Sequence, residues 1–232
     1  MLFRSQVEAG IVINSRGLNK VLAIDSLSAN VQAGVLWTEL LQESLKRRLT
    51  PPVLAEYQEI TVGGTLSVGG IGVSSPQYGS QGDSVLELDV VTGDGRLVTC
   101  SPASNSDLFN AALGGLGQGG LIVRARVKLV PAPTHAATSI LSYDDLDSYL
   151  RDALLIAAEL RFEHQQGGPA IQADGSWRHL MEVTKFYTPP QQPDFKKLEA
   201  GLRFTSMRDP SISTYWDYVH RTSARVTLSR EL

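Results

Sequence analysis

Two glycine-rich runs constrain the fold of this chain more than any other feature of its sequence. The first covers residues 61–72 and reads TVGGTLSVGGIG, and the second covers residues 114–120 and reads GGLGQGG. Glycine has no Cβ atom, so it lets the main chain approach a ligand closely and adopt positive φ angles. The two runs therefore predict main chain wrapped around a large, flat ligand. Tight turns in a β-rich core are the alternative interpretation of the same glycines.

The second run also matches the spacing G-x-G-x-x-G over residues 115–120, which is typical of Rossmann dinucleotide sites. Such a site needs a strand before the glycines and a helix after them, because the pyrophosphate lies at the helix N-terminus. Here a helical pattern precedes the run and a strand pattern follows it. The context therefore argues against a Rossmann site, and the sequence also lacks the Gly-Lys-Ser/Thr spacing of a P-loop.

Composition and charge exclude several classes of partner. The 232 residues are 42% hydrophobic, enough for a sizeable core, and the net charge of −3 gives no basic footprint for nucleic acid or an anionic membrane. One cysteine forms no internal disulfide, and four scattered histidines lack the spacing of a metal site. The sequence has no bilayer-spanning apolar run and no signal-peptide apolar region at Met1–Gln6. We expect a cytoplasmic protein with a small-molecule substrate, and we predict no oligomeric state.

Periodicity and turn residues predict an α+β chain. Its first part is expected to combine strands at residues 11–13, 21–24, 29–33, 85–91, 96–100 and 121–130 with helices at 38–49 and 106–113. Thr38 is the expected N-cap of the first helix, and Pro51 and Pro52 are expected to end it. Pro131–Pro133 is taken as a domain boundary. Beyond it, the patterns predict a helix at 143–160, a loop at 165–177, a strand at 179–187 and a helix at 193–202.

Four linked segments give the sequence a family pattern. They are TVGGTLS at residues 61–67, LELDVVTGDGRLVTC at 86–100, DLFNAALGGLGQ at 107–118 and the basic strand Arg124–Arg126. In this order they resemble the FAD-binding domain of cytokinin dehydrogenase-like flavoproteins, which belong to the vanillyl-alcohol-oxidase superfamily. The resemblance is near-continuous from about Pro52 to Pro133.

This resemblance implies a fold and a cofactor. Residues 1–133 would form a PCMH-type FAD-binding domain, with the first subdomain truncated and the second largely complete, and residues 134–232 would form part of an α+β substrate domain. FAD would lie extended between the two subdomains. By position in the family pattern, the implied flavin contacts are Thr61, Gly63, Gly64, Ser67, Gly70, Ile71, Gly120, Leu121 and Ile122. Main-chain N–H groups and small hydroxyls in a glycine-rich turn can hold a pyrophosphate without a cationic side chain.

The implied activity is that of an FAD-dependent oxidoreductase, which oxidises an amine or alcohol carbon by hydride transfer to the flavin. Glu56 is the implied catalytic residue, because the family places an aspartate followed by tyrosine five residues before the TVGG threonine, and here the pair is Glu56-Tyr57. The extra methylene of glutamate requires a shifted backbone to reach the same point. An exposed loop glutamate is the alternative. A sugar or alditol oxidase of the same superfamily and a flavin-less binding module also remain open.

The sequence departs from the family pattern in other places. The family's second acid, in a Tyr-x-Glu-Gly segment, is replaced by Gln166, which weakens the case for cytokinin as the substrate. We interpret the neighbouring His164 as a loop histidine and Cys100 as a buried inert thiol. Gln118 and Arg124 could reach the flavin edge or merely pack and solvate, and the latter is our interpretation of Arg124, which shares one strand face with Arg126.

The largest departure concerns the flavin attachment site. Family members carry an Arg-Gly-x-Gly-His-Ser motif whose histidine binds FAD covalently. This chain begins near the tail of that motif, at Ser5–Val7, and its histidines lie in other contexts, so the attachment histidine is absent from it. We therefore expect the chain to be an internal fragment, inactive alone, of a longer parent protein whose natural N-terminus lies upstream.

Overall fold

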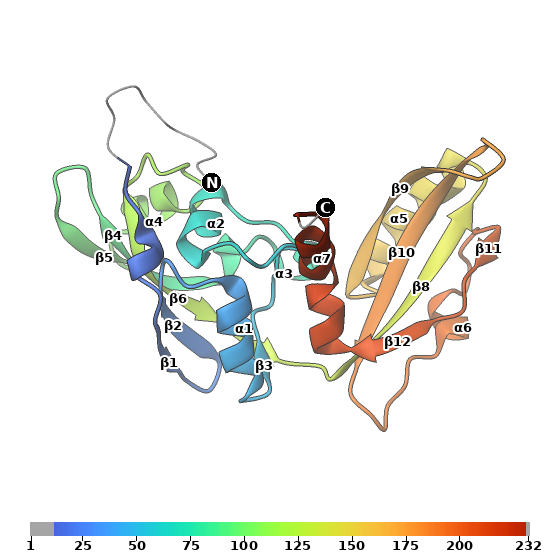
Figure 1. Ribbon diagram of the computed structural model, residues 1–232, viewed down its shortest axis with the longest axis horizontal. Helices are drawn as coiled ribbons and strands as arrows, with labels where there is room; N and C mark the ends of the chain where they lie inside the picture. The colour runs from blue at the N-terminus through green and yellow to red at the C-terminus, as the bar shows by residue number, and fades with distance from the viewer. Residues whose placement is uncertain (1–11, 231–232) are drawn as a thin grey trace.

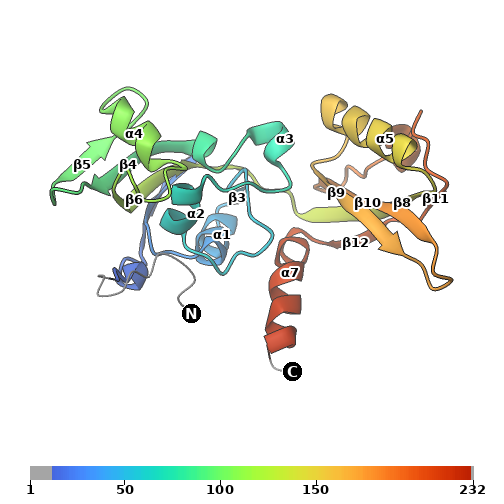
Figure 2. The ribbon, with the colours of Figure 1, turned by 90° about the horizontal axis from the view of Figure 1, so that it is seen from above.

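The computed structural model describes the backbone of residues 12–230 and the side chains of residues 12–222. Two antiparallel sheets lie side by side with helices packed around them, and helix α7 stands in the space between them (Figures 1 and 2). This mixture of helices and strands agrees with the predicted α+β class. In chain order the elements are η1 (Ser15–Gly17), β1 (Val21–Ile24), β2 (Ser28–Gln32), α1 (Trp37–Leu45), β3 (Leu49–Thr50), α2 (Val62–Val68), α3 (Ser75–Tyr78), η2 (Gly82–Ser84), β4 (Val85–Val91), β5 (Leu97–Cys100), α4 (Ser106–Ala112), β6 (Leu121–Lys128), β7 (Val130–Pro131), β8 (His135–Tyr143), α5 (Leu146–Glu159), β9 (His164–Ile171), β10 (Trp177–Tyr187), α6 (Phe195–Leu198), β11 (Ser206–Met207), β12 (Ser211–Thr214) and α7 (Tyr215–Arg230).

The first sheet has the strand order β1-β2-β6-β4-β5, and every neighbouring pair is antiparallel. The hairpin predicted at residues 85–91 and 96–100 is confirmed as β4 and β5. Along β4 the apolar residues Leu88 and Val90 are fully buried, while the acids Glu87 and Asp89 bind Arg124 of β6 at 2.7 and 2.5 Å. Arg124 therefore packs on the strand face as interpreted, while its guanidinium is held by two carboxylates of the neighbouring strand rather than by solvent alone.

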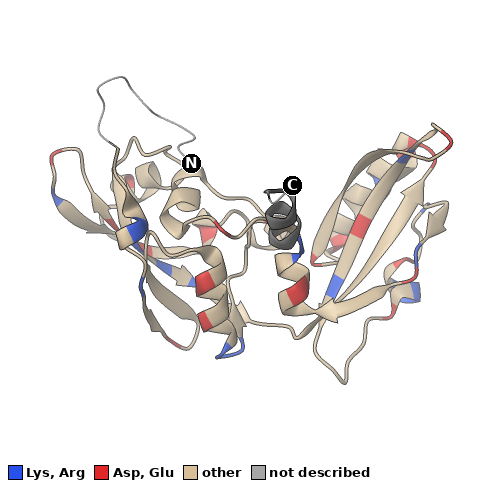
Figure 3. Cartoon of the chain, viewed as in Figure 1, with Lys and Arg blue, Asp and Glu red and all other residues tan. Residues whose placement is uncertain are grey.

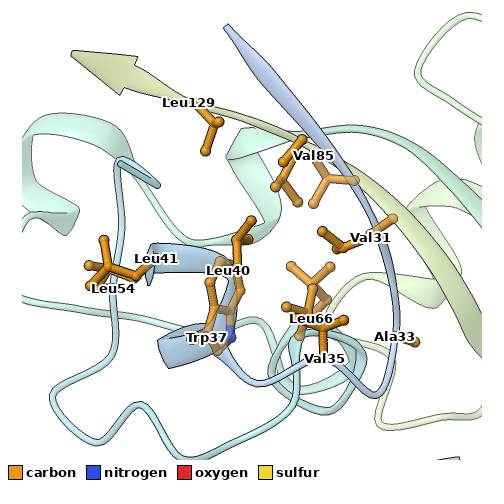
Figure 4. Packing of buried hydrophobic residues seen from close by; sticks show 14 of the residues in the cluster. Val31, Ala33, Val35, Trp37, Leu40, Leu41, Leu54, Leu66, Val85 and Leu129 are labelled. Atoms are coloured by element: carbon orange, nitrogen blue, oxygen red, sulfur yellow. The ribbon is translucent and has the colours of Figure 1, made fainter. Parts of the chain in front are cut away.

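The larger core lies between this sheet and helices α1 and α2. Val31 of β2, Leu40 of α1 and Leu66 of α2 are all fully buried and pack together (Figure 4). The buried residues Leu40 and Leu41 of α1 recur with Trp37 on one side of the helix, as its apolar periodicity predicts. The core thus anchors the helix that carries most of the first glycine run.

Helix α1 differs from the prediction at both ends. It begins at Trp37, because the Glu39 carboxylate accepts a hydrogen bond from the Leu36 N–H at 2.9 Å, so Thr38 is not the N-cap. The helix ends at Leu45, well before the prolines that were expected to stop it. A turn follows in which Arg48 has a φ of 58°, and the next two residues pair with β7 as strand β3.

The first glycine run forms a helix in its first half, not the glycine-rich turn implied by the resemblance. Helix α2 covers Val62–Val68, and Thr61 is its N-cap, since its Oγ1 accepts a hydrogen bond from the Gly64 N–H at 3.3 Å. Gly69, with a φ of 102°, ends the helix in a left-handed conformation. Main-chain N–H groups of the run are therefore partly used inside the helix.

The second sheet has the strand order β11-β8-β10-β9, and β12 also pairs with β8. Helix α5 packs on one face over a second, smaller core that includes Leu141, Ile156 and Met181. Asp145 caps this helix by accepting a hydrogen bond from the Ser148 N–H at 2.7 Å, so the helix starts three residues later than predicted. The preceding residues instead form β8, which the sequence patterns did not predict.

The loop predicted at residues 165–177 is wrong for most of its length, because His164–Ile171 forms strand β9. Each of its residues pairs with β10, including Gln166 with Glu182. Glycine and proline in this segment favoured a loop, yet both are tolerated in an edge strand such as β9. The strand predicted at 179–187 is confirmed as β10, and the helix predicted at 193–202 is reduced to α6.

Other predictions have mixed outcomes. Strands β1, β2 and β6 and helix α4 are confirmed, although β6 ends at Lys128. Val12 and Ile13 form no strand, and Ile11 lies outside the described residues. In the described part of the chain, no helix is long and apolar enough to cross a membrane.

Helix α7 joins the two sheets. Tyr215, Tyr218 and Val219 of this helix belong to the larger core, although they follow Pro133 in the sequence. The Tyr215 hydroxyl lies 3.0 Å from Thr50 Oγ1, and the Gln58 amide donates a hydrogen bond to the Val219 carbonyl at 2.9 Å. The helix therefore belongs by packing to both halves, and the division at Pro133 stays a prediction.

Candidate active site

A cavity of about 370 Å³ lies where the two sheets and helix α7 meet. Its lining includes the apolar residues Pro52, Leu54, Pro131 and Phe186 and a group of polar residues that we call the polar end. Those polar residues are Glu56, Gln58, His164, Tyr218 and Arg221. An apolar chamber with a few converging polar groups is the usual form of a small-molecule site.

Arg221 of α7 is the centre of the polar end. Its Nη2 atom lies 3.1 Å from Glu182 Oε1 and 3.7 Å from Glu56 Oε1. Its Nη1 atom donates to the Tyr218 carbonyl at 2.9 Å, and the guanidinium lies over the Tyr218 ring, 3.9 Å from the ring centroid. The side chain is thus fixed by its own helix while it binds acids from two other segments.

His164 lies inside this cluster rather than in a loop. It is fully buried on β9, and its Nδ1 atom shares a hydrogen bond with the Tyr218 hydroxyl. Burial, with a smaller contribution from the Arg221 charge, lowers the pKa of His164 to about 3. Burial also raises the pKa of Tyr218. The pair is therefore uncharged near neutral pH, and the interpretation of His164 as a loop histidine is wrong.

Gln166 contacts an acid on the next strand. Its Nε2 atom donates to Glu182 Oε1 at 3.2 Å, and the two residues are cross-strand partners. No local pattern in the sequence singles out Glu182. Only the register of β9 against β10 shows that Glu182 lies opposite Gln166. That register could not be predicted, because β9 was predicted as a loop.

Glu56 lies in the segment between β3 and α2, and its side chain is 42% exposed. It lines the cavity and contacts Arg221, so it has a specific environment rather than that of a free surface residue. Two positions later, Gln58 is almost fully buried, and its Oε1 atom has no hydrogen-bond partner in the described part of the chain. The segment thus presents a carboxylate and an amide at the polar end.

The structure joins the two glycine runs. The Gly114 N–H donates to the Leu66 carbonyl at 2.9 Å, and the Leu116 N–H donates to the Ser67 carbonyl at 2.8 Å. The second run therefore lies against the C-terminal end of α2. The prediction that both runs build one surface agrees with this contact.

Internal packing explains several of the glycines without any ligand. A Cβ atom on Gly63 would lie 2.6 Å from the Ala33 Cβ atom, and one on Gly70 would lie 2.1 Å from Gln81 Oε1. At Gly120, where φ is 134°, it would lie 2.6 Å from Val90 Cγ1. A Cβ atom on Gly64 would meet only the capping Thr61 hydroxyl, at 2.7 Å. These glycines are needed for the fold itself.

The remaining residues among the implied flavin contacts differ in their exposure to solvent. Ser67 donates its hydroxyl to the Gly63 carbonyl at 2.8 Å, and the Ile122 side chain is buried, so only its main chain could meet a ligand. Ile71, in contrast, is 80% exposed. Leu121 is partly buried at the start of β6.

An exposed apolar rim borders the joined glycine runs. Val68, Ile71 and Leu116 are 55%, 80% and 66% exposed, although large apolar side chains are usually buried. A second hollow of about 510 Å³ borders Gly69 and Gly114. A glycine surface with an apolar rim fits a large flat ligand such as FAD.

Other groups give no sign of a separate site. Cys100 is fully buried, and burial raises the pKa of its thiol, as expected for an inert cysteine. No cluster of metal-ligating side chains occurs among the residues that the structure describes. Positive and negative side chains are mixed along both sheets (Figure 3).

The joined glycine runs, the apolar rim and the neighbouring cavity are compatible with a flavin-binding class of protein. Residues 1–101 match the FAD binding domain family. By sequence the chain is similar to cytokinin dehydrogenase-like, FAD-binding oxidoreductases, which confirms the resemblance found in its motifs.

Named relatives support this assignment. The chain is 40% identical over 217 residues to the uncharacterized oxidoreductase ORF5 in the fasciation locus of Rhodococcoides fascians, covering 93% of this chain and 50% of that protein. It is 42% identical over 183 residues to cytokinin dehydrogenase 9 of Oryza sativa subsp. japonica, covering 75% and 35%. It is 32% identical over 262 aligned positions to cytokinin dehydrogenase 2 of Arabidopsis thaliana, covering 99% and 52%. The chain thus spans about half the length, or less, of these relatives.

Proposed function

We propose that the protein takes part in FAD-dependent oxidation of an amine or alcohol carbon, with hydride transfer from the substrate in the cavity to the flavin. One observation carries the proposal. Glu56 and Gln58 line the cavity just before the first glycine run, and Val73 and Ser74 line it just after. A flavin held on that run would therefore border the cavity directly.

The residues of both runs would hold the FAD. The main chain from Gly69 to Gly72 and from Gly114 to Leu121, together with the exposed Ile71 side chain, offers the surface for it. When bound, FAD supplies the hydride acceptor. Residues 1–133 would then serve as the flavin-binding unit and residues 134–232 as the substrate unit.

Within the cavity, the Glu56 carboxylate would accept a hydrogen bond from the N–H or O–H group of the reacting carbon. The apolar wall formed by Pro52, Leu54 and Phe186 would exclude water and hold the apolar part of the substrate. The unpartnered Gln58 carbonyl oxygen offers a second acceptor, which a ligand donor would satisfy.

The test is a visible spectrum of the complete gene product, purified and reconstituted with FAD. We expect oxidised-flavin bands that bleach anaerobically when an amine or alcohol substrate is added. A screen of isoprenoid and aromatic amines against polyols separates an amine oxidoreductase from a sugar or alditol oxidase. A product that stays colourless after reconstitution would overturn the proposal.

A flavin-less binding module is the second candidate. The observation in its favour is that Gly63, Gly70 and Gly120 already have internal reasons to be glycine. In that case the fold would persist with no cofactor, and ligands would bind the cavity without turnover. The same spectrum, combined with ligand binding measured by calorimetry, distinguishes the two candidates.

A further inference from the structure

We propose that Arg221 is a positioning residue for Glu56: it holds the carboxylate toward the cavity and is itself held by Glu182, which Gln166 supports. This inference rests on the proposed function, in which Glu56 accepts the substrate hydrogen bond. It adds a chain of contacts that runs from the second sheet, through helix α7, to the acid on the first half of the molecule.

The contacts of the guanidinium give it one orientation. The guanidinium donates a hydrogen bond to the Tyr218 carbonyl at 2.9 Å and also lies over the Tyr218 ring. Glu182 Oε1 accepts from Nη2 at 3.1 Å. A planar guanidinium bound in this way cannot turn freely, and the same Nη2 atom also lies 3.5 Å from His164 Nε2 and 3.7 Å from Glu56 Oε1.

The exposed fractions of the side chains indicate that Glu56 depends on Arg221 for its orientation. The Arg221 and Glu182 side chains are 21% and 26% exposed, whereas Glu56 is 42% exposed. Among the described residues, Arg221 is the side chain that forms an ion pair with Glu56. A half-exposed glutamate with several rotatable bonds loses its direction when its partner is removed.

The charges around the cluster are unequal. Two carboxylates share one guanidinium, and the buried His164 is neutral. Glu163, which also lines the cavity, does not compete for Arg221, because it binds Lys185 Nζ at 2.7 Å and the Phe186 N–H at 2.8 Å. How closely the Arg221 guanidinium binds Glu56 or Glu182 is therefore the feature of the site that a substitution can change.

Gln166 supports Glu182 in this arrangement. Its amide donates to the same Oε1 atom that accepts from Arg221. A neutral donor at this position holds Glu182 without adding a third negative charge. The departure from the family's acid thus has a structural consequence, because it leaves Arg221 available to Glu56.

The experiment is a double-mutant cycle in the flavin-loaded complete gene product. We expect Arg221→Ala to lower kcat by about 100-fold with little change in KM, because the change acts mainly through the position of Glu56. In a Glu56→Gln background, Arg221→Ala is expected to lower kcat almost no further. Arg178→Ala, which removes an exposed partner of Asp144 at 3.4 Å, is the matched control.

Chemical rescue supplies a second readout that a purely structural role would not give. Millimolar guanidinium is expected to restore part of the kcat of Arg221→Ala and to leave Arg178→Ala unchanged. Arg221→Lys should retain more activity than Arg221→Ala, and it carries the test if the alanine variant does not fold.

The outcomes separate this inference from the proposed function. If Glu56→Gln keeps wild-type turnover, the proposed role of Glu56 fails. Two outcomes would overturn the inference about Arg221 alone. In the first, Glu56→Gln is impaired but Arg221→Ala, folded and with flavin bound, is not. In the second, the effects of the two substitutions add fully and guanidinium restores no activity.

Discussion

Tyr218 of helix α7 and His164 of strand β9 share a buried hydrogen bond between residues 54 positions apart in the sequence. The bond closes the wall of the cavity between the two sheets. Burial of the imidazole, with a smaller contribution from the nearby Arg221 charge, lowers the pKa of His164 from 6.5 to about 3 and so couples its protonation to folding.

The first prediction follows from that pKa. As the pH falls below 6.5, the unfolded chain takes up the proton before the folded chain does. The stability tied to neutral His164 is therefore fully present above about pH 6.5 and is lost toward pH 3, by about 1.4 kcal/mol per pH unit. We expect the free energy of unfolding of His164→Gln to depend less on pH over this window. Urea titrations at several pH values measure it, and His135→Gln is the control; equal pH slopes for wild type and His164→Gln would contradict the prediction.

The second prediction concerns the hydroxyl of Tyr218. Tyr218→Phe removes the partner of a buried imidazole nitrogen, so we expect a loss of about 1–3 kcal/mol of stability. Tyr78→Phe, at a more exposed position on the same cavity, should change stability by less than about 0.5 kcal/mol. Thermal unfolding followed by circular dichroism compares the two variants. Equal effects would show that the buried bond contributes little.

The third prediction separates backbone strain from packing at two glycines with positive φ. Gly117 has a φ of 81° and no atom within 4 Å of a built Cβ, so Gly117→Ala should cost about 1–2 kcal/mol from conformation alone. Gly120→Ala should cost clearly more, because its Cβ would also lie 2.7 Å from the Val91 carbonyl oxygen. Urea unfolding of both variants tests this order, and a smaller loss for Gly120→Ala would refute it.

The fourth prediction tests the flavin surface without disturbing the core. Ile71 is 80% exposed, so Ile71→Ser should change stability by less than about 0.5 kcal/mol. If Ile71 packs on FAD, the same change should weaken flavin affinity by about tenfold, as expected for one lost apolar contact of 1–2 kcal/mol. Leu154→Ser, at a site 73% exposed on α5, is the control. A fluorescence titration with FAD measures both, and equal affinities would place the flavin elsewhere.

The fifth prediction concerns Gln166→Glu, which restores the family's acid. The new carboxylate would face Glu182 across the strands and draw Arg221 toward the second sheet, away from Glu56. We therefore expect this substitution to lower kcat rather than raise it, by about tenfold. Gln165→Glu, on the neighbouring position of the same strand, serves as the comparison, and a gain of activity in Gln166→Glu would contradict the account.

The sequence was informative where local patterns agree with tertiary contacts. The alternation of β4 and the turn after it predicted the hairpin, and the glycine runs predicted a shared surface that the Gly114–Leu66 hydrogen bond now explains. The role of Glu56 is inferred from its fixed distance to the TVGG segment, and it stays a prediction. These features depend on neighbours in the sequence.

The cluster around Arg221 could not be predicted in the same way. Arg221, Glu182 and His164 come from three elements that meet only through the register of β9 on β10 and the docking of α7. The glycines and proline of β9 favoured a loop, since local propensity does not record an edge position in a sheet. The identity of the charge partners is therefore a property of the fold, which periodicity alone does not contain.

The most direct test of the account is the anaerobic reduction of bound flavin by substrate, followed by stopped-flow absorbance in wild type and Glu56→Gln. We predict that both proteins bind FAD and that the flavin bands bleach rapidly in wild type and at least about 100-fold more slowly in the variant. Equal bleaching rates in the two flavin-bound proteins would contradict the role of Glu56, and the absence of bound flavin in both would contradict the flavoprotein assignment itself.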